Sequence, residues 1–121
     1  MKVNTKFTNI SLSPSISEYI EKKLESLLKF FKNASEVLVN VEVAKTTNHH
    51  KSGDIFKAEI HLITDGGEYY ASAETEDLYA SIDKVKDEIV RELTSKRKKA
   101  LRLFRKGGAK IKNMLKGFIN R

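Results

Sequence analysis

Valine occupies every second position from residue 37 to residue 43, and no other feature of the chain constrains its fold as strongly. Successive side chains of a β-strand point to opposite faces, so this alternation predicts a strand with one apolar face. The positions between the valines include Asn40 and Glu42, which suit a face toward water. A sheet built around such a strand needs other elements to cover one side only.

Three further segments, residues 2–8, 56–62 and 68–74, show the same period of two and predict three more strands. Asp65, Gly66 and Gly67 lie between the last two segments and form a hairpin-turn signal. Residues 14–31 have apolar side chains at helical spacing, and Ser13 can cap this segment with Pro14 at the first helical position. Ser15 and Glu18 could form a capping box instead. These residues therefore predict an amphipathic helix.

A long second helix is expected after the last strand, capped by Asp77 or Thr75 and continuing to about Lys106. Its buried stripe steps by four or three residues through Leu78, Ile82, Val85, Ile89 and Leu93. The complete order is β-α-β-β-β-α. This order predicts an α+β fold, with a four-stranded sheet and two helices packed on one face.

A single domain suits a chain of 121 residues. We expect residues 1–106 to form the α+β domain, and Gly107 and Gly108 to break the long helix. Residues 107–121 are expected to form a basic amphipathic tail that is mobile alone and becomes ordered on RNA. The chain has no cysteine, no apolar run long enough to span a membrane and no N-terminal signal peptide, which is compatible with a reducing cytosol.

The net charge of +7 is unevenly distributed along the chain. Residues 1–83 contain 9 Lys/Arg and 13 Asp/Glu, whereas residues 84–121 contain 14 Lys/Arg and 3 Asp/Glu. From Thr94 onward there are 11 basic residues and no acidic residue. A long run of one sign creates a positive potential that favours a polyanion, so we expect nucleic-acid binding rather than a merely solvated surface.

The candidate binding residues are basic side chains on the two predicted helices, where they could lie along phosphates. On the second helix, the residues that recur on one face are Lys84, Arg91, Lys98, Arg102 and Arg105. Lys96 and Arg97 widen this surface, and Glu88 interrupts it. On the first helix, the candidates are Lys22 and Lys29, seven residues apart, and the adjacent Lys23. Three glutamates on the first helix offset the charge of these lysines.

No residue pattern supports catalysis. The three histidines, His49, His50 and His61, show no metal-ligand spacing, and no cysteine could complete a zinc site. Asp77 and Asp83 lie where carboxylates cap a helix and favour its dipole, which explains both residues without acid–base chemistry. We therefore expect no enzymatic activity, no metal site and no cofactor.

Residues 66–83, with the sequence GGEYYASAETEDLYASID, resemble the ribosome-hibernation family of short hibernation-promoting factors and ribosome-associated inhibitors. The likeness covers about residues 1–99. It implies a β-α-β-β-β-α fold similar to double-stranded-RNA-binding domains. It also implies binding to the small ribosomal subunit and its 16S-type rRNA, where mRNA and tRNA would lie. Translation would be suppressed in the cytoplasm by occlusion of that region, without chemistry.

Within this family the chain resembles the short form with an unusual basic extension. Too few residues follow position 99 to form a separate dimerisation domain such as the long form carries. The RNA contacts that the resemblance implies are firmest at Lys23 and Arg91. They are weaker at Ser26, Glu88 and Ser95, where relatives often have lysine.

Two other functions stay open at the level of the sequence. The first is a general structured-RNA-binding protein of the double-stranded-RNA-binding class. The second is a module that docks on a membrane surface or on a partner through its basic tail, and of these the membrane is less favoured. The sequence leaves the oligomeric state open as well.

Overall fold

The structure is a computed structural model that describes residues 1–46 and 53–106 of the chain. Its strands are β1 (Lys2–Thr8), β2 (Leu38–Thr46), β3 (Ile55–Thr64) and β4 (Gly67–Thr75), and its α-helices are α1 (Pro14–Glu25) and α2 (Leu78–Arg105). Two short 3-10 helices, η1 (Leu28–Phe30) and η2 (Ala34–Glu36), lie between α1 and β2. All four predicted strands and both predicted helices are therefore present.

The four strands form one mixed sheet in the order β1-β2-β3-β4. β1 is parallel to β2, with Val3 opposite Val39, whereas the β2–β3 and β3–β4 pairs are antiparallel. Parallel neighbours require a crossover connection, and α1 lies in that connection. A two-residue turn, Asp65-Gly66, is enough to join the antiparallel strands β3 and β4.

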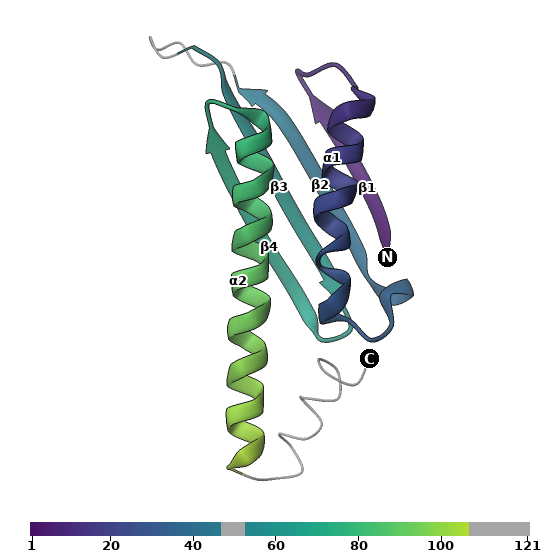
Figure 1. Cartoon of the computed structure of the whole chain (residues 1–121), viewed down its shortest axis with the longest axis vertical. Coiled ribbons are helices and arrows are strands. Elements are labelled where there is room, and N and C mark those ends of the chain that lie inside the picture. The colour runs from purple at the N-terminus through teal and green to yellow at the C-terminus, as the bar shows by residue number, and fades with distance from the viewer. Residues whose placement is uncertain (47–52, 107–121) are drawn as a thin grey trace.

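Both helices lie on the same face of this sheet, α1 over β1 and β2, and α2 over β3 and β4 (Figure 1). No helix of the described chain covers the opposite face, which we call the open face. This arrangement confirms the predicted α+β class, a four-stranded sheet with two helices packed on one face. Within residues 1–46 and 53–106, no strand or helix covers the outer sides of α1 and α2.

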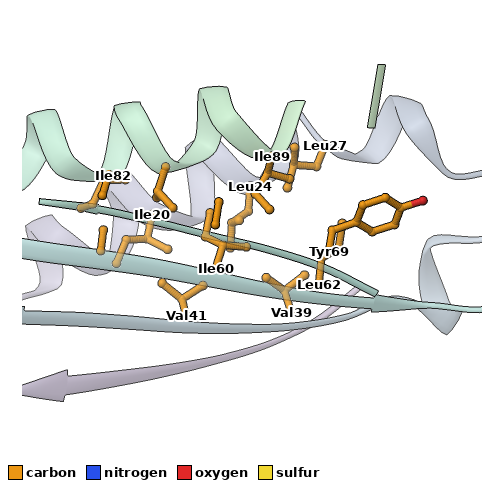
Figure 2. Close-up of a cluster of buried hydrophobic side chains, with 14 of the residues drawn as sticks. Ile20, Leu24, Leu27, Val39, Val41, Ile60, Leu62, Tyr69, Ile82 and Ile89 are labelled. Atoms are coloured by element: carbon orange, nitrogen blue, oxygen red, sulfur yellow. The ribbon is translucent and has the colours of Figure 1, made fainter. Parts of the chain in front are cut away.

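The core lies between the sheet and the two helices. The four alternating valines of residues 37–43 are all buried, none of them more than 4% exposed. Figure 2 shows Ile20 and Leu24 of α1 together with Ile82 and Ile89 of α2, all directed toward the strands. All five residues of the predicted buried stripe of α2 are indeed buried. The apolar period of the sequence therefore identifies the covered side of β2 and of α2 correctly.

Helix α1 is shorter than the sequence analysis predicts, because it ends at Glu25 rather than near residue 31. The Ser26 hydroxyl donates a hydrogen bond of 2.6 Å to the Lys23 carbonyl, and the Ser26 and Leu27 amides bond to carbonyls three residues back. Such bonds tighten the last turn of a helix, and η1 follows directly. Leu27 is nevertheless fully buried. Its spacing therefore reflects burial and not continued α-helix.

Helix α2 begins after Asp77, whose carboxylate accepts a hydrogen bond of 3.3 Å from the Tyr79 amide. Thr75 is therefore not the cap, and its hydroxyl instead donates to the Asp77 carbonyl at 2.6 Å. The helix ends at Arg105, close to the predicted end, and runs past the edge of the sheet (Figure 1). The predicted tail, residues 107–121, lies outside the described residues, so the division of the chain after residue 106 stays a prediction.

Replacing Ile89 with alanine should destabilise the domain by about 2–5 kcal/mol, because Ile89 is fully buried and its truncation leaves a cavity. Chemical denaturation followed by circular dichroism measures this change in the free energy of unfolding. Ser95→Ala, at an exposed position of the same helix, is the control and should change that free energy by less than about 0.5 kcal/mol. A loss below about 1 kcal/mol for Ile89→Ala would contradict the packing.

Candidate nucleic-acid interface

The outward side of α2 carries five basic side chains, which we call the basic stripe. Its members are Lys84, Arg91, Lys98, Arg102 and Arg105, and all five are exposed. They lie away from the buried stripe, because steps of seven, seven, four and three residues return to nearly the same side of a helix. The 28-residue helix is about 42 Å long, so the basic stripe forms a linear array of positive charge.

A carboxylate lies beside the first half of the basic stripe. Asp87 is exposed, three residues after Lys84 and four before Arg91, and residues at these spacings are neighbours on a helix surface. It pairs with Lys86 at 3.6 Å. Glu88, which the sequence analysis names as the interruption, is only partly exposed. From residue 94 onward no acidic residue occurs, so the second half of the basic stripe carries the more uniform positive charge.

Lys96 is exposed but does not belong to the basic stripe. Its ammonium lies 4.9 Å from the centroid of the Tyr69 ring, and a β-carbon at Gly67 would lie 3.2 Å from it. Burial raises the pKa of Tyr69 to about 12, with the charge of Glu92 adding to the effect, so the ring stays neutral under the cation. Lys96 is therefore turned toward the β3–β4 hairpin. Arg97, the neighbouring candidate, is exposed.

The lysines at positions 22 and 29 do not share one helical face. Lys22 is exposed on α1, whereas Lys29 lies in η1, after α1 has ended. The ammonium of Lys29 lies 5.6 Å from the centroid of the Phe30 ring. The seven-residue spacing therefore does not align the two lysines as it would on a continuous helix.

Lys23 lies between α1 and α2. Its ammonium is 3.2 Å from Asp83 Oδ1 and 5.2 Å from the centroid of the Tyr19 ring. The Tyr19 hydroxyl donates a hydrogen bond of 2.6 Å to the same carboxylate. Tyr79 completes the group, because the Tyr19 and Tyr79 rings meet edge to face with centroids 4.8 Å apart. We call these four residues the interhelical cluster.

The interhelical cluster sets the charge state of its members. Partial burial pushes the pKa of Asp83 up, but hydrogen bonds from Tyr19 and Lys23 outweigh this and hold the pKa below the ordinary value of aspartate. The hydrogen bond to Asp83 raises the pKa of Lys23, so its ammonium stays charged at neutral pH. Asp83 is therefore a link between the helices rather than the cap or dipole partner that the sequence suggests.

Tyr19 and Tyr79 are not among the site residues expected from the sequence. The signal that could have found them is their spacing, because Tyr19 precedes Lys23 by four residues and Tyr79 precedes Asp83 by four. Residues four apart are neighbours on a helix surface. Which two helix surfaces face each other, however, follows only from the packing of both helices on the sheet.

The open face of the sheet carries paired charges of both signs. Lys57 lies 2.7 Å from Glu59, and the Tyr70 hydroxyl donates a hydrogen bond of 2.7 Å to the same carboxylate. His61 also lies on this face, 3.7 Å from Glu68. Because Glu59 and Glu68 lie on this face among its basic residues, it offers a polyanion less than the basic stripe does.

Within residues 1–46 and 53–106, no group of three side chains is arranged to hold a metal ion. His49 and His50 lie outside the described residues. Neither α1 nor α2 is a helix that is both long and apolar enough to cross a membrane. The outward charge of α2 and the interhelical cluster are the features that the described chain presents for binding.

Residues 3–101 match the protein family described as sigma 54 modulation protein / S30EA ribosomal protein. The chain is 32% identical over 99 residues to a ribosome hibernation promoting factor of Klebsiella oxytoca, which covers 82% of this chain and 96% of that protein. The chain is 33% identical to the ribosome hibernation promoting factor of Escherichia coli K12, with the same coverage of both chains. A ribosome hibernation promotion factor of a Picosynechococcus species is 38% identical over 100 residues, and there the alignment spans half of the relative.

Two solved structures have a similar fold. The N-terminal domain of Protein Y from Thermus thermophilus has a TM-score of 0.65 and 27% identity, covering 76% of this chain and 94% of that one. A ribosomal subunit interface protein from Coxiella burnetii has a TM-score of 0.63 over 80% of this chain and 98% of that one. Its sequence identity is 18%, so the likeness to it concerns the fold alone.

Removing one hydroxyl with Tyr19→Phe should raise the pKa of Asp83 toward the ordinary value of about 3.9, because the carboxylate loses a hydrogen-bond donor. NMR titration of the Asp83 carboxyl carbon measures this pKa. The pKa of Asp83 is lower in the folded protein than in the unfolded chain, so its ionised carboxylate stabilises the fold when the pH is above the unfolded-state pKa. This stabilisation is lost as the pH falls through the folded-state pKa. The stability advantage of the wild type over the variant should therefore shrink below about pH 4.

Tyr70→Phe is the matched control, since Tyr70 donates a hydrogen bond of 2.7 Å to Glu59 on the open face. It removes the same kind of bond without touching the interhelical cluster. The pKa of Asp83 should therefore be the same in Tyr70→Phe as in the wild type. An Asp83 titration that does not change in Tyr19→Phe would show that the hydroxyl does not hold this carboxylate.

Proposed function

Because the chain belongs to the sigma 54 modulation protein / S30EA ribosomal protein family, which includes ribosome hibernation promoting factors, we propose that it is a ribosome hibernation factor. In this proposal it binds the small ribosomal subunit through 16S-type rRNA, in the cytoplasm. It inhibits translation by occluding the decoding region, where mRNA and tRNA would otherwise bind. This action requires tight binding and no catalysed reaction.

The observation that carries the proposal is the basic stripe of α2. Folded RNA presents closely spaced phosphates, and basic side chains that approach them gain affinity from charge attraction and counterion release. Three of the five members of the basic stripe are arginines, whose planar guanidinium groups can contact a phosphate through two parallel hydrogen bonds. A linear array of such groups suits the backbone of an RNA rather than a small anion.

Helix α1 extends this surface. The family resemblance implies RNA contacts most firmly at Lys23 and Arg91, and the fold places them on helices of the same layer (Figure 1). The side chain of Lys23 is 34% exposed although its ammonium pairs with Asp83, so it can still approach an RNA at the junction of the helices. RNA helices are recognised largely through shape and through phosphate and ribose contacts, which a broad two-helix surface can supply.

Replacing Arg91 and Lys98 together with glutamate should reduce co-sedimentation with isolated small ribosomal subunits to the background level. Two attractive contacts with phosphates would become repulsive. Both side chains are exposed on the side of α2 that faces away from the core, so the circular dichroism spectrum and the melting temperature should change little.

The matched control is Lys2→Glu combined with Lys6→Glu. It changes the net charge by the same amount, but in β1, where Val3 and Phe7 pack against the core and the alternate side chains lie on the open face. This control should co-sediment nearly as well as the wild type. Equal loss of binding in both double variants would point to net charge alone, and retained binding by Arg91→Glu/Lys98→Glu would count against the basic stripe.

In a translation system of purified components, the protein should inhibit synthesis of a reporter. Initiator tRNA and initiation factors should relieve this inhibition as their concentrations rise, because they would compete for the occluded region. Reporter yield and the amount of tRNA bound to the small subunit measure the two effects together. Inhibition that persists at saturating competitor, with tRNA still bound, would contradict occlusion.

A further inference from the structure

The interhelical cluster contains an exposed aromatic ring that the proposed phosphate contacts do not use. Tyr79 lies in the first turn of α2, and 38% of its surface is exposed. Its hydroxyl makes no hydrogen bond with any residue in the described ranges, 1–46 and 53–106. The core does not require this side chain, because Leu78 and Ile82 supply the buried contacts of the same turn.

The Tyr79 ring is supported by a side chain that is itself held in place. Tyr19 meets it edge to face at a centroid distance of 4.8 Å. Tyr19 in turn donates a hydrogen bond of 2.6 Å to Asp83 and lies beneath the Lys23 ammonium, 5.2 Å from the ring centroid. A ring fixed in this way loses little conformational entropy when a ligand stacks on it.

The surroundings of this ring suit one part of an RNA in particular. Unpaired bases stack on aromatic side chains, whereas the bases of a duplex are already stacked on each other and are not available. Lys23 belongs to the same cluster, and Lys22 lies three residues after Tyr19 on the exposed side of α1. Both ammonium groups could therefore meet the phosphates of a nucleotide whose base lies on Tyr79.

We propose that Tyr79, supported by Tyr19, is a stacking site for an unpaired RNA base at the junction of α1 and α2. The inference rests on the proposed function, because it assigns to the same RNA-binding surface a preference for single-stranded nucleotides. Such a stacking site would distinguish this surface from one that binds only RNA duplexes. The basic stripe supplies affinity for any RNA backbone, and Tyr79 adds a contact that needs a base.

The test compares two short single-stranded RNAs of equal length, oligouridine and an abasic oligoribonucleotide with the same backbone. Base–aromatic stacking predicts that the wild type binds oligouridine at least about 5-fold more tightly than the abasic strand. Tyr79→Leu should bind both strands equally, whereas Tyr79→Phe should keep the preference. Tyr70→Leu, which removes an exposed ring from the open face, is the matched control and should keep it too.

NMR of the wild-type protein provides a readout that needs no variant. The ring protons of Tyr79 should shift when oligouridine is added and should stay in place with the abasic strand. A preference for oligouridine that survives in Tyr79→Leu, or Tyr79 ring signals that do not respond to oligouridine, would overturn the stacking site. A wild-type protein that fails to co-sediment with small ribosomal subunits would be a different failure, that of the proposed function.

Discussion

One apolar face of the sheet has to be removed from water, and two helices lying side by side achieve this (Figure 1). The valines of β2 and the aliphatic side chains of β3 meet Ile20 and Leu24 of α1 and the buried stripe of α2 (Figure 2). Each helix packs on the sheet with one side, so its opposite side faces solvent and can contact binding partners. The basic stripe and the interhelical cluster both follow from this burial.

The same burial gives the molecule two different faces. The helical side carries the basic stripe from Lys84 to Arg105, whereas the open face mixes charges of both signs, such as the Lys57–Glu59 pair. Two faces of unlike charge orient a protein on a polyanion, because only one of them gains energy by approaching it. In the proposed function this orientation places both helices against rRNA and the open face away from it.

Much of the fold could be predicted from the sequence because side chains that become buried recur at a regular spacing along the chain. The alternation of valines marks β2, and the steps of four and three residues mark the covered side of α2 as far as Leu93. The end of α1 could not be predicted in this way. Leu27 continues the apolar pattern, but the α-helix ends at Glu25, where the Ser26 hydroxyl bonds to the Lys23 carbonyl.

The candidate site was less predictable than the fold, because side-chain direction depends on other elements. Lys96 is expected from the sequence to widen the basic surface, yet its ammonium lies over Tyr69 of β4, whereas Lys98 is exposed on the outward side of α2. Lys23 appears in the sequence as one of several surface lysines, and its contact with Asp83 exists only because α1 and α2 share one layer. Residues 107–121 lie outside the described chain, so the predicted role of the tail stays a prediction.

A cryo-electron microscopy map of the protein bound to the small ribosomal subunit would show which face of the domain contacts the rRNA. We expect density for the domain in the decoding region, with α1 and α2 against 16S-type rRNA and the open face of the sheet directed away from it. Arg91, Arg102 and Arg105 should then lie within contact distance of phosphates. Density elsewhere on the subunit, or the open face of the sheet against the RNA, would rule out occlusion of the decoding region through the basic stripe.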